Sequence, residues 1–415
     1  MITAVKGMND ILPTEITKWR FVEETARRIF CLYGFSELRT PVVEKTELFS
    51  RGMGQDTDVV EKQMYTFLDK SESSMTLRPE ATASVLRAVI EHGLLGQEPV
   101  QKIFSIGPMF RYERPQKGRY RQFHQINCER LGEAGPLSDA ETLGLAYDIT
   151  LALGLSDVML EVNSLGCPAC RPGFKKALQD FLEARKEDLC PDCLRRMYTN
   201  PLRVLDCKVD ACKSAVEGAP ENSGYLCEEC RSHYGTVLTG LDALNIPYEK
   251  NPRLVRGLDY YNRTAFEMTA KGLGAQNAVG GGGRYDGLVA ALGGSDVPGI
   301  GFAFGMERLL MLIPDMAEEK KGCFIVALGE NTKIEALRLA SKLRQNGIRA
   351  ELILEKSFKI RMRQAGKSGY PVCLIIGDDE MANGTVAMKD MNTGVQEQVK
   401  NEDLINRINM ILKGE

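Results

Sequence analysis

The segment from Gln101 to Leu131 predicts a β-hairpin, and this hairpin constrains the fold of the 415-residue chain more than any other feature. Pro115 and Gly118 interrupt its centre, so we interpret the segment as strand, short loop and strand. Other hairpins and helices surround it in mixed order. That order favours an α+β fold around an antiparallel sheet over a doubly wound parallel sheet.

The return strand of the hairpin predicts a binding surface. Side chains two residues apart share one face of a strand. One face therefore carries a cation, an aromatic ring, two amides and a carboxylate, namely Arg121, Phe123, Gln125, Asn127 and Glu129. The loop and its flanks carry the cations Arg111, Arg114, Lys117, Arg119 and Arg121. Cations suit phosphates and a ring suits a base, so we expect a nucleotide; a basic hairpin with a solvated face is the alternative.

Composition narrows the class of protein. The sequence starts without the basic and then apolar pattern of a secretion signal, and no apolar run is long enough to span a bilayer. We therefore expect a cytoplasmic protein that does not enter a membrane. Only three histidines occur, which disfavours a Ser–His–Asp hydrolase and favours chemistry carried by arginines and carboxylates. A net charge of −3 limits nucleic-acid contacts to local basic patches.

Hydrophobic periodicity and turn signals predict the remaining elements. Helices are predicted over 17–33, 80–93, 138–154, 331–346 and 357–369. Strands are predicted over 35–43, 58–69, 75–78, 158–166 and 254–270, and again near 280–283 and 299–305. Residues 314–321 are predicted to be a linker, and the β-α-β-α-β pattern after them indicates a small α/β domain.

Eight cysteines fall within a charged, helical stretch from residue 167 to about residue 246. They form four closely spaced pairs, which are Cys167 and Cys170, Cys190 and Cys193, Cys207 and Cys212, and Cys227 and Cys230. Two such pairs make a tetrahedral four-thiolate zinc site, so the stretch predicts one or two structural zinc sites. His233 is a candidate to replace one thiol. Packed free thiols and an iron–sulfur centre are the alternatives.

Three further segments are candidates for partners of the hairpin. TLRPEAT (76–82) places Glu80 where a strand meets a helix; a carboxylate that merely complements the helix dipole is the alternative. LVRGLDYYNRTAFE (254–267) carries Arg256 and the pair Tyr260 and Tyr261, which could equally be an exposed arginine and core aromatics. GIGFAFGMERL (299–309) carries Arg308 in the first turn of a helix, where a solvated arginine is also common.

These segments, in this order and with TPVVE after the first helix, resemble the motifs of class II aminoacyl-tRNA synthetases and, more narrowly, of the histidyl-tRNA synthetase family. RGLDYY is the sharpest match, and MYTNPLRVLDCK (197–208) extends the resemblance across nearly the whole chain. The cysteine pairs depart from the usual family pattern. The resemblance implies a catalytic domain over 1–320, interrupted by a helical insertion over about 167–246, and an α/β anticodon-binding domain over 322–415.

The resemblance also implies the reaction and the residues that serve it. A homodimeric ligase of this family activates L-histidine with ATP and Mg²⁺ to histidyl-adenylate and transfers it to the 3′ end of tRNA(His). The histidine-binding residues implied are Glu80, Ala81, Thr82, Arg111, Gln125, Glu129, Arg256, Tyr260 and Tyr261. The ATP-binding residues implied are Arg111, Arg119, Phe123 and Arg308, with Arg111 and Arg256 as the catalytic cations. Negative charge accumulates on phosphate oxygens in this reaction, so positioning and cations suffice without a base.

The expected RNA contacts lie outside the cavity residues. The loop 114–117 is expected to meet the acceptor end of the tRNA. A basic stretch in the last domain is expected to contact RNA, with a solvated helix face as the alternative; its members are Lys356, Lys359, Arg361, Arg363 and Lys367. The alternative function is a non-enzymatic paralogue that regulates the ATP phosphoribosyltransferase of histidine biosynthesis. The intact RGLDYY motif and the presence of the last domain disfavour it.

Overall fold

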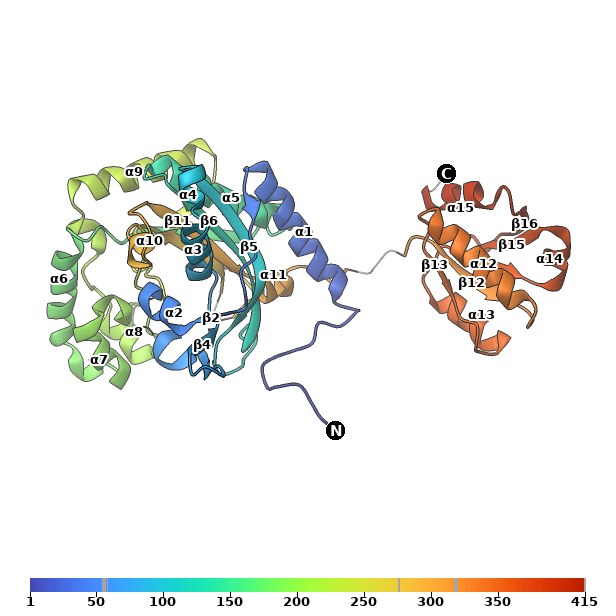
Figure 1. Cartoon of the computed structure of the whole chain (residues 1–415). Helices are drawn as coiled ribbons and strands as arrows, with labels where there is room; N and C mark the ends of the chain where they lie inside the picture. The colour runs from blue at the N-terminus through green and yellow to red at the C-terminus, as the bar shows by residue number, and fades with distance from the viewer. Residues whose placement is uncertain (54–56, 58, 275–276, 317–319, 414–415) are drawn as a thin grey trace. The chain divides into compact units, whose positions relative to one another are not determined.

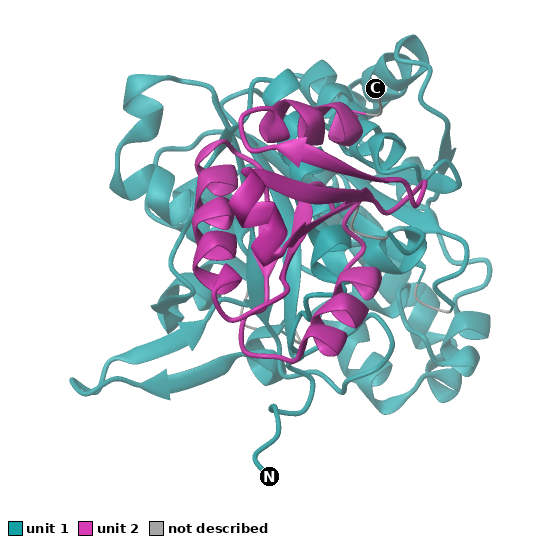
Figure 2. Ribbon diagram, turned by 90° about the vertical axis from the view of Figure 1, so that its right-hand side faces the viewer, with its two compact units in different colours: residues 1–316 teal, residues 317–415 magenta. Residues whose placement is uncertain are grey.

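The computed structural model describes residues 1–53, 57, 59–274, 277–316 and 320–413. Contacts divide the chain into two compact units, residues 1–316 and 317–415, which Figure 2 colours separately. Within the described ranges, no helix combines the length and the apolar character needed to cross a membrane.

Unit 1 is built on an eight-stranded sheet whose inner strands pair antiparallel (Figure 1). The strand order is β1 (Ser36–Glu37), β5 (Gln101–Phe110), β6 (Gln122–Leu131), β11 (Gly299–Gly305), β10 (Ala278–Arg284), β9 (Asn262–Ala270), β7 (Val158–Ser164) and β8 (Tyr248–Lys250). The edge pairs β1–β5 and β7–β8 are parallel. The predicted α+β class is confirmed, and the predicted hairpin is β5–β6, with Gln101 opposite Leu131.

Helices cover the two faces of this sheet unequally. The helices of one face are α1 (Ile16–Leu32), α5 (Pro136–Ala152), α9 (Glu228–Ala243) and α11 (Met306–Leu312). They bury their apolar stripes against Ile126 and Cys128 of β6, among other core residues. The opposite face carries the helices α3 (Thr82–Glu91), α4 (Leu94–Gln97) and α10 (Leu288–Ala291). That face is left partly open, and it is where the alternate residues of β6 point.

Two predicted strands are wrong over part of their length. Residues 59–63 form a π-helical turn, η1 (Val59–Gln63), and the strand β3 (Tyr65–Leu68) begins only after it; residue 58 lies outside the described residues. Residues 254–261 form a loop, and β9 begins at Asn262. The apolar residues of this loop still pack in the core, but side chains bind its carbonyl oxygens where a neighbouring strand would otherwise do so.

Smaller elements complete the N-terminal half of unit 1. The predicted strand over 35–43 is interrupted, since β1 spans two residues and β2 (Val43–Lys45) follows only after a break. β2 pairs with β4 (Ser74–Leu77), which pairs with β3, in a three-stranded sheet. Helix α2 (Thr46–Met53) packs beside it.

A helical insertion follows β7 in the sequence and precedes α9 and β8. Its elements are α6 (Arg171–Glu183), η2 (Lys186–Asp188), α7 (Pro191–Thr199), η3 (Pro201–Val204), α8 (Asp210–Ala215) and η4 (Asn222–Tyr225). These short elements share a core that includes Phe174, Leu178, Met197 and Val204. The chain then returns to the eight-stranded sheet through the long helix α9 (Figure 1).

Unit 2 is a five-stranded mixed sheet flanked by helices. The strand order is β13 (Ala350–Leu352), β12 (Cys323–Ala327), β14 (Val372–Ile376), β15 (Thr385–Asp390) and β16 (Gln396–Lys400). The predicted alternating pattern corresponds to the parallel strands β12, β13 and β14, whereas the antiparallel hairpin β15–β16 was not predicted. The helices are α12 (Thr332–Gln345), α13 (Phe358–Lys367), α14 (Asp378–Asn383) and α15 (Leu404–Lys413). Of the predicted linker, residues 317–319 lie outside the described residues.

The basic stretch of unit 2 is less exposed than predicted. Arg361 is buried, because it shares the inward side of α13 with Ala365, one turn further along the helix. The remaining cations of the stretch are exposed, namely Lys356, Lys359, Arg363 and Lys367. The expected basic surface therefore consists of these four side chains.

Candidate active site

A cavity of about 530 Å³ opens over the antiparallel sheet of unit 1. Its lining comes from β6, β10 and β11, from the start of α3 and from the loop 254–261, and the insertion contributes Leu205, Asp206 and Lys208. The predicted site residues among the lining are Glu80, Thr82, Arg111, Arg119, Phe123, Gln125, Arg256, Tyr260, Tyr261 and Arg308. Segments that lie far apart in the sequence thus meet in one cavity. Ala81 and Glu129 are the predicted residues that do not line it.

The alternation predicted for the return strand is confirmed in its middle, whereas Arg121 precedes β6, does not line the cavity and lies 4.1 Å from the centroid of the Tyr112 ring. Phe123, Gln125 and Asn127 face the cavity, whereas Ile126 and Cys128 enter the main core. One strand therefore supplies both the packing that fixes the sheet and the polar floor of the cavity.

Glu129 lies buried beneath the cavity and holds two hydrogen bonds. The hydroxyl of Thr82 donates to its Oε1 at 2.6 Å, and the hydroxyl of Tyr285 donates to its Oε2 at 2.5 Å. Burial raises the pKa of Glu129 to about 8; the two donated hydrogen bonds oppose that rise, and the nearby Glu80 adds to it. A group with this pKa changes its protonation state near neutral pH, so a ligand that donates a hydrogen bond to it favours the carboxylate.

Glu80 stands at the start of α3 and serves two purposes. Its Oε2 accepts a hydrogen bond from the amide of Thr82 at 3.0 Å, and its Oε1 accepts one from the amide of Ala83 at 2.7 Å. It thus satisfies amides that a helix start leaves open, while it also lines the cavity. Ala81 lies between these groups as a buried residue at the helix start.

Gln125 offers an acceptor to a ligand. Its Oε1 is buried and has no hydrogen-bond partner among the described residues, although the side chain lines the cavity. A buried amide oxygen without a donor is costly, and a bound ammonium or amide group would remove that cost.

Three arginines, Arg111, Arg119 and Arg308, line the same cavity as Phe123. The guanidinium of Arg111 lies 5.3 Å from the centroid of the Phe123 ring, and Arg119 pairs with Glu113 at 3.2 Å. Burial lowers the pKa of Arg308, and the positive charges of Arg119 and Arg111 lower it further. Guanidinium groups that repel one another in a half-buried cavity favour the binding of an anion.

Arg256, Tyr260 and Tyr261 form a second group of contacts in the cavity. Nη1 of Arg256 donates to Oε1 of Glu267 at 2.8 Å, and its guanidinium lies 5.8 Å from the centroid of the Tyr261 ring. The rings of Tyr260 and Tyr261 are 4.5 Å apart. Nε of Arg256 is buried and has no partner within the described part of the chain.

Two glycines allow this close packing. A Cβ atom at Gly281 in β10 would lie 2.7 Å from Nη1 of Arg256 and 2.6 Å from the carbonyl oxygen of Phe266. A Cβ atom at Gly301 in β11 would collide with the carboxylate of Glu129. Glycine is therefore required where the sheet passes beneath these two charged groups.

The sequence did not lead us to Tyr285 or to Glu267. Tyr285 is fully buried and directs its hydroxyl at Glu129. It follows the glycine run of β10 in the string GGGGRYD. This run was the one available signal for Tyr285, because a closely packed strand end fixes the position of the residue that follows it. Glu267 lies on β9, and strand alternation gave no reason to single it out as a site residue.

His233 is a predicted metal ligand that the structure places elsewhere. Its Nε2 lies 2.8 Å from Oδ2 of Asp139, which also accepts the hydroxyl of Thr264 at 2.6 Å. Burial would raise the pKa of Asp139, but the hydrogen bond from His233 and the charge and hydrogen bonds of Arg284 lower it. His233 sits nearly one turn beyond Cys230 on α9, and this turn carries it away from the thiols and toward α5.

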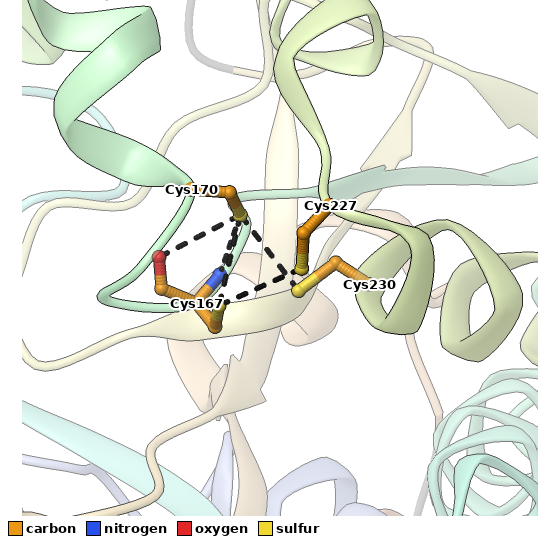
Figure 3. A group of neighbouring side chains, drawn as sticks. All are labelled: Cys167, Cys170, Cys227 and Cys230. Carbon is orange, nitrogen blue, oxygen red and sulfur yellow. Dashed lines mark hydrogen bonds between the residues drawn. The ribbon is translucent and has the colours of Figure 1, made fainter.

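The eight cysteines of the insertion fall into two groups of four. Cys167, Cys170, Cys227 and Cys230 form one group, whose sulfur atoms converge as Figure 3 shows. Cys190, Cys193, Cys207 and Cys212 form the other. Within each group the sulfur atoms all lie within 4.8 Å of one another, and all eight cysteines are free thiols. Each group could hold a metal ion, and neither lines the cavity.

Comparison with known proteins gives one consistent result. Residues 7–309 match the family profile described as histidyl-tRNA synthetase, and residues 322–410 match the profile described as anticodon binding domain. The histidine–tRNA ligase of Geobacter sulfurreducens is 52% identical over 401 residues, which cover 96% of this chain and 97% of that protein. The histidine–tRNA ligase of Nitratidesulfovibrio vulgaris is 52% identical over 409 residues, covering 98% of each.

A solved structure agrees with the sequence relatives. The crystal structure of apo histidyl-tRNA synthetase from S. aureus superimposes with a TM-score of 0.82 at 38% identity. The match covers 98% of this chain and 100% of that chain.

Proposed function

The chain belongs to the histidyl-tRNA synthetase family, and from that premise we propose how its cavity divides between histidine and ATP. Its activity is that of a histidine–tRNA ligase. The regulatory paralogue is not favoured, because histidine–tRNA ligases match along nearly the full length and the anticodon-binding domain is present.

ATP occupies the side of the cavity with Phe123 and the three clustered cations. Phe123 stacks on the adenine ring, and the Arg308 guanidinium lies on the other face of the base and reaches toward the γ-phosphate. Arg111 contacts the α-phosphate and Arg119 contacts the terminal phosphates. The mutual repulsion of these arginines supports this assignment, because bound phosphates would relieve it. Mg²⁺ bound with ATP would offset part of the negative charge of the phosphates that Arg111 and Arg119 contact.

Histidine occupies the side with the carboxylates and the tyrosines. Glu80, Thr82 and Gln125 hold the α-amino group, and the acceptor of Gln125 that has no partner among the described residues supports this role. Glu129 and Tyr261 bind the two imidazole nitrogens, each of which needs a partner. A buried site of this kind rejects amino acids of similar size, because its polar groups would be left without partners.

Arg256 lies between the two substrates and orients the reaction. The histidine carboxylate attacks the α-phosphorus, and the bond to pyrophosphate breaks in line with it. Negative charge develops on the phosphate oxygens, and Arg111 and Arg256 stabilise that charge without any proton transfer. The observation that carries this proposal is the meeting of cations and buried carboxylates, from distant segments, around one cavity.

Replacing Arg256 tests the proposal. Arg256→Ala should lower histidine-dependent ATP–pyrophosphate exchange by about 10²–10³-fold while histidine still binds in calorimetry. Arg39→Ala removes an exposed arginine elsewhere in unit 1 and should leave exchange unchanged. Exchange at the wild-type rate in Arg256→Ala would refute the assigned role, and exchange driven by another amino acid in the wild type would refute the specificity.

The remaining partners are assigned more coarsely. We place the acceptor end of tRNA(His) at the loop 114–117 and assign RNA contacts to the four exposed cations around α13. The enzyme acts as a homodimer through the N-terminal motif that contains Pro41. The two four-thiol groups serve as structural metal sites and take no part in the reaction.

A further inference from the structure

We propose that the chain binds two structural zinc ions, one in each four-cysteine group, and that both ions position the Leu254–Tyr261 loop of the substrate cavity. The first group (Cys167, Cys170, Cys227 and Cys230) is called the base site, and the second (Cys190, Cys193, Cys207 and Cys212) is called the inner site. The second half of the proposal rests on the proposed roles of Arg256 and Tyr261. The first half is independent of them.

The spacing of the sulfur atoms matches a tetrahedral zinc site. In the base site the Sγ–Sγ distances are 3.7 Å for Cys167–Cys170, 3.9 Å for Cys167–Cys227 and 3.8 Å for Cys170–Cys230. Zn–S bonds of about 2.3 Å in a tetrahedron place sulfur atoms about 3.8 Å apart. Four sulfurs this close leave room for one ion, whereas an iron–sulfur cluster separates its thiolates further.

In both groups a backbone amide donates a hydrogen bond to a cysteine sulfur, which stabilises negative charge on that sulfur. The amide of Cys167 donates to Sγ of Cys170 at 3.2 Å, and the amide of Cys190 donates to Sγ of Cys212 at 3.1 Å. Hydrogen bonds from backbone amides are typical partners of metal-bound thiolates. That the same arrangement occurs twice argues against eight thiols that are merely packed together.

The base site lies where the two ends of the helical insertion meet. Cys167 and Cys170 follow β7, and Cys227 and Cys230 begin α9, as Figure 3 shows. An ion at this position joins segments 60 residues apart in the sequence. It would do so in addition to the apolar core that the helices of the insertion share.

Contacts lead from the base site directly to Tyr261. Arg171, the residue after Cys170, donates through Nη1 to the carbonyl oxygen of Tyr261 at 3.0 Å. The amide of Arg263 donates at 2.9 Å to the carbonyl oxygen of Gly166, the residue before Cys167. The side chain of Arg263 also binds Glu229, which lies between Cys227 and Cys230. Both halves of the base site therefore hold the chain on either side of Asn262.

Contacts from the inner site reach the other end of the loop. Asn200 and Arg203 lie between the inner-site ligands Cys193 and Cys207. Arg203 donates through Nη1 to the carbonyl oxygen of Arg256 at 3.2 Å, and Nδ2 of Asn200 donates to Oδ1 of Asp259 at 2.6 Å. The loop is not a strand, so these contacts replace the ladder that would otherwise fix it.

Metal analysis of the full-length protein tests the proposal. Protein made without a metal-binding tag or chelator should contain two zinc ions per chain by mass spectrometry. Cys167→Ser with Cys227→Ser should remove one ion, and Cys190→Ser with Cys207→Ser should remove the other. All four positions are only half-buried, which limits damage to the core. Cys31→Ser, at an exposed cysteine on α1, is the matched control and should retain two.

Kinetics separate positioning from a general effect on folding. Loss of the base site should raise the KM for histidine in pyrophosphate exchange by about 10- to 100-fold, because Tyr261 moves. Loss of the inner site should act mainly on kcat, because Arg256 moves. Double variants that lose zinc with unchanged KM and kcat would overturn the positioning role.

The metal half of the proposal is decided without activity. Fewer than two zinc ions in the wild-type protein, iron in their place, or two ions retained in both double variants would overturn it. If the double variants do not fold, the native wild-type protein is titrated with an organomercurial, which should release two zinc ions per chain into a chromogenic chelator. Release of any other number would overturn the metal half of the proposal. Two zinc ions in a protein without histidine-dependent exchange would refute the proposed function alone.

Discussion

At the scale of single residues, Glu129 has the least expected environment in the cavity region. It is buried under the sheet, accepts hydrogen bonds from Thr82 and Tyr285, and has its pKa raised to about 8 by burial. A protonated carboxyl group is a poor acceptor, so binding an imidazole N–H through Glu129 requires the proton to leave. The Tyr285 hydroxyl favours this ionised form. With the role proposed for Glu129, Tyr285 would be a positioning residue that acts through this hydrogen bond.

Tyr285→Phe should shift the pH dependence of histidine use. Because the ionised form of Glu129 is the competent one, kcat/KM for histidine should rise with pH through a pKa near 8. Removing the donor raises that pKa, so the rise should move to higher pH, and kcat/KM near pH 7 should fall by about tenfold or more. Exchange kinetics across pH 6–9 measure it.

The matched control for this change is Tyr370→Phe in unit 2, which removes a buried tyrosine hydroxyl far from the cavity lining in sequence. It should leave the profile unchanged. A uniform loss of rate in Tyr285→Phe, with no shift along the pH axis, would show that the hydroxyl supports only packing.

The positions of several cavity-lining residues could be predicted from strand alternation or from element boundaries, whereas the roles assigned to them come from the family resemblance. Phe123 and Gln125 follow from the period of a strand, and Glu80 follows from the start of a helix. Tyr285 could not be predicted in this way. Its role depends on a contact with a residue 156 positions away, and nothing local to GGGGRYD encodes that distance.

At the scale of elements, the Leu254–Tyr261 loop shows where periodicity misleads. Its apolar and aromatic residues read as a strand, and Leu254 and Tyr261 are indeed buried. Their carbonyl oxygens, however, accept side-chain hydrogen bonds from Asn163 and Arg171. Burial alone cannot distinguish a strand from a packed loop, because the difference lies in the partners of the backbone, which come from other parts of the chain.

Strand β10 runs beneath this loop and depends on its glycines. Gly281→Ala should lower the melting temperature, since overpacking costs about 1–3 kcal/mol. It should also lower pyrophosphate exchange by about 10²-fold, because the new methyl group would lie 2.7 Å from Nη1 of Arg256 and would displace that side chain. Thermal unfolding and exchange kinetics measure the two effects.

Gly96→Ala provides the control, because Gly96 lies in α4 with no atom within 4 Å of an added Cβ. Alanine favours a helix over glycine, so this variant should be as stable as the wild type or slightly more stable. If Gly281→Ala matches the control in both measurements, neither the stability nor the exchange activity depends on the close approach of Arg256 to β10.

At the scale of the whole molecule, the cavity and the match to the anticodon binding domain lie in different units. Every residue that lines the cavity belongs to unit 1, and unit 2 has its own cores, including Ile325 and Leu374 on one face of its sheet and Phe324 and Tyr370 on the other. The alternation of strands and helices made this second sheet predictable. Its final antiparallel hairpin was missed because the strand β16 is polar and exposed along most of its length.

A chain ending at residue 316 should therefore still activate histidine. Histidine-dependent pyrophosphate exchange should stay close to the rate of the full chain, because the cavity and its supporting contacts are retained. Charging of tRNA(His) should fall by at least about tenfold, since the phosphate and base contacts of the anticodon-binding domain are lost, and with fewer phosphate contacts the remaining charging should be less sensitive to added salt than that of the full chain. Parallel exchange and aminoacylation assays, with circular dichroism to verify folding, measure the two steps. A folded fragment that charges tRNA as well as the full chain would contradict the RNA-binding role of unit 2, and a folded fragment without exchange would show that activation needs both units.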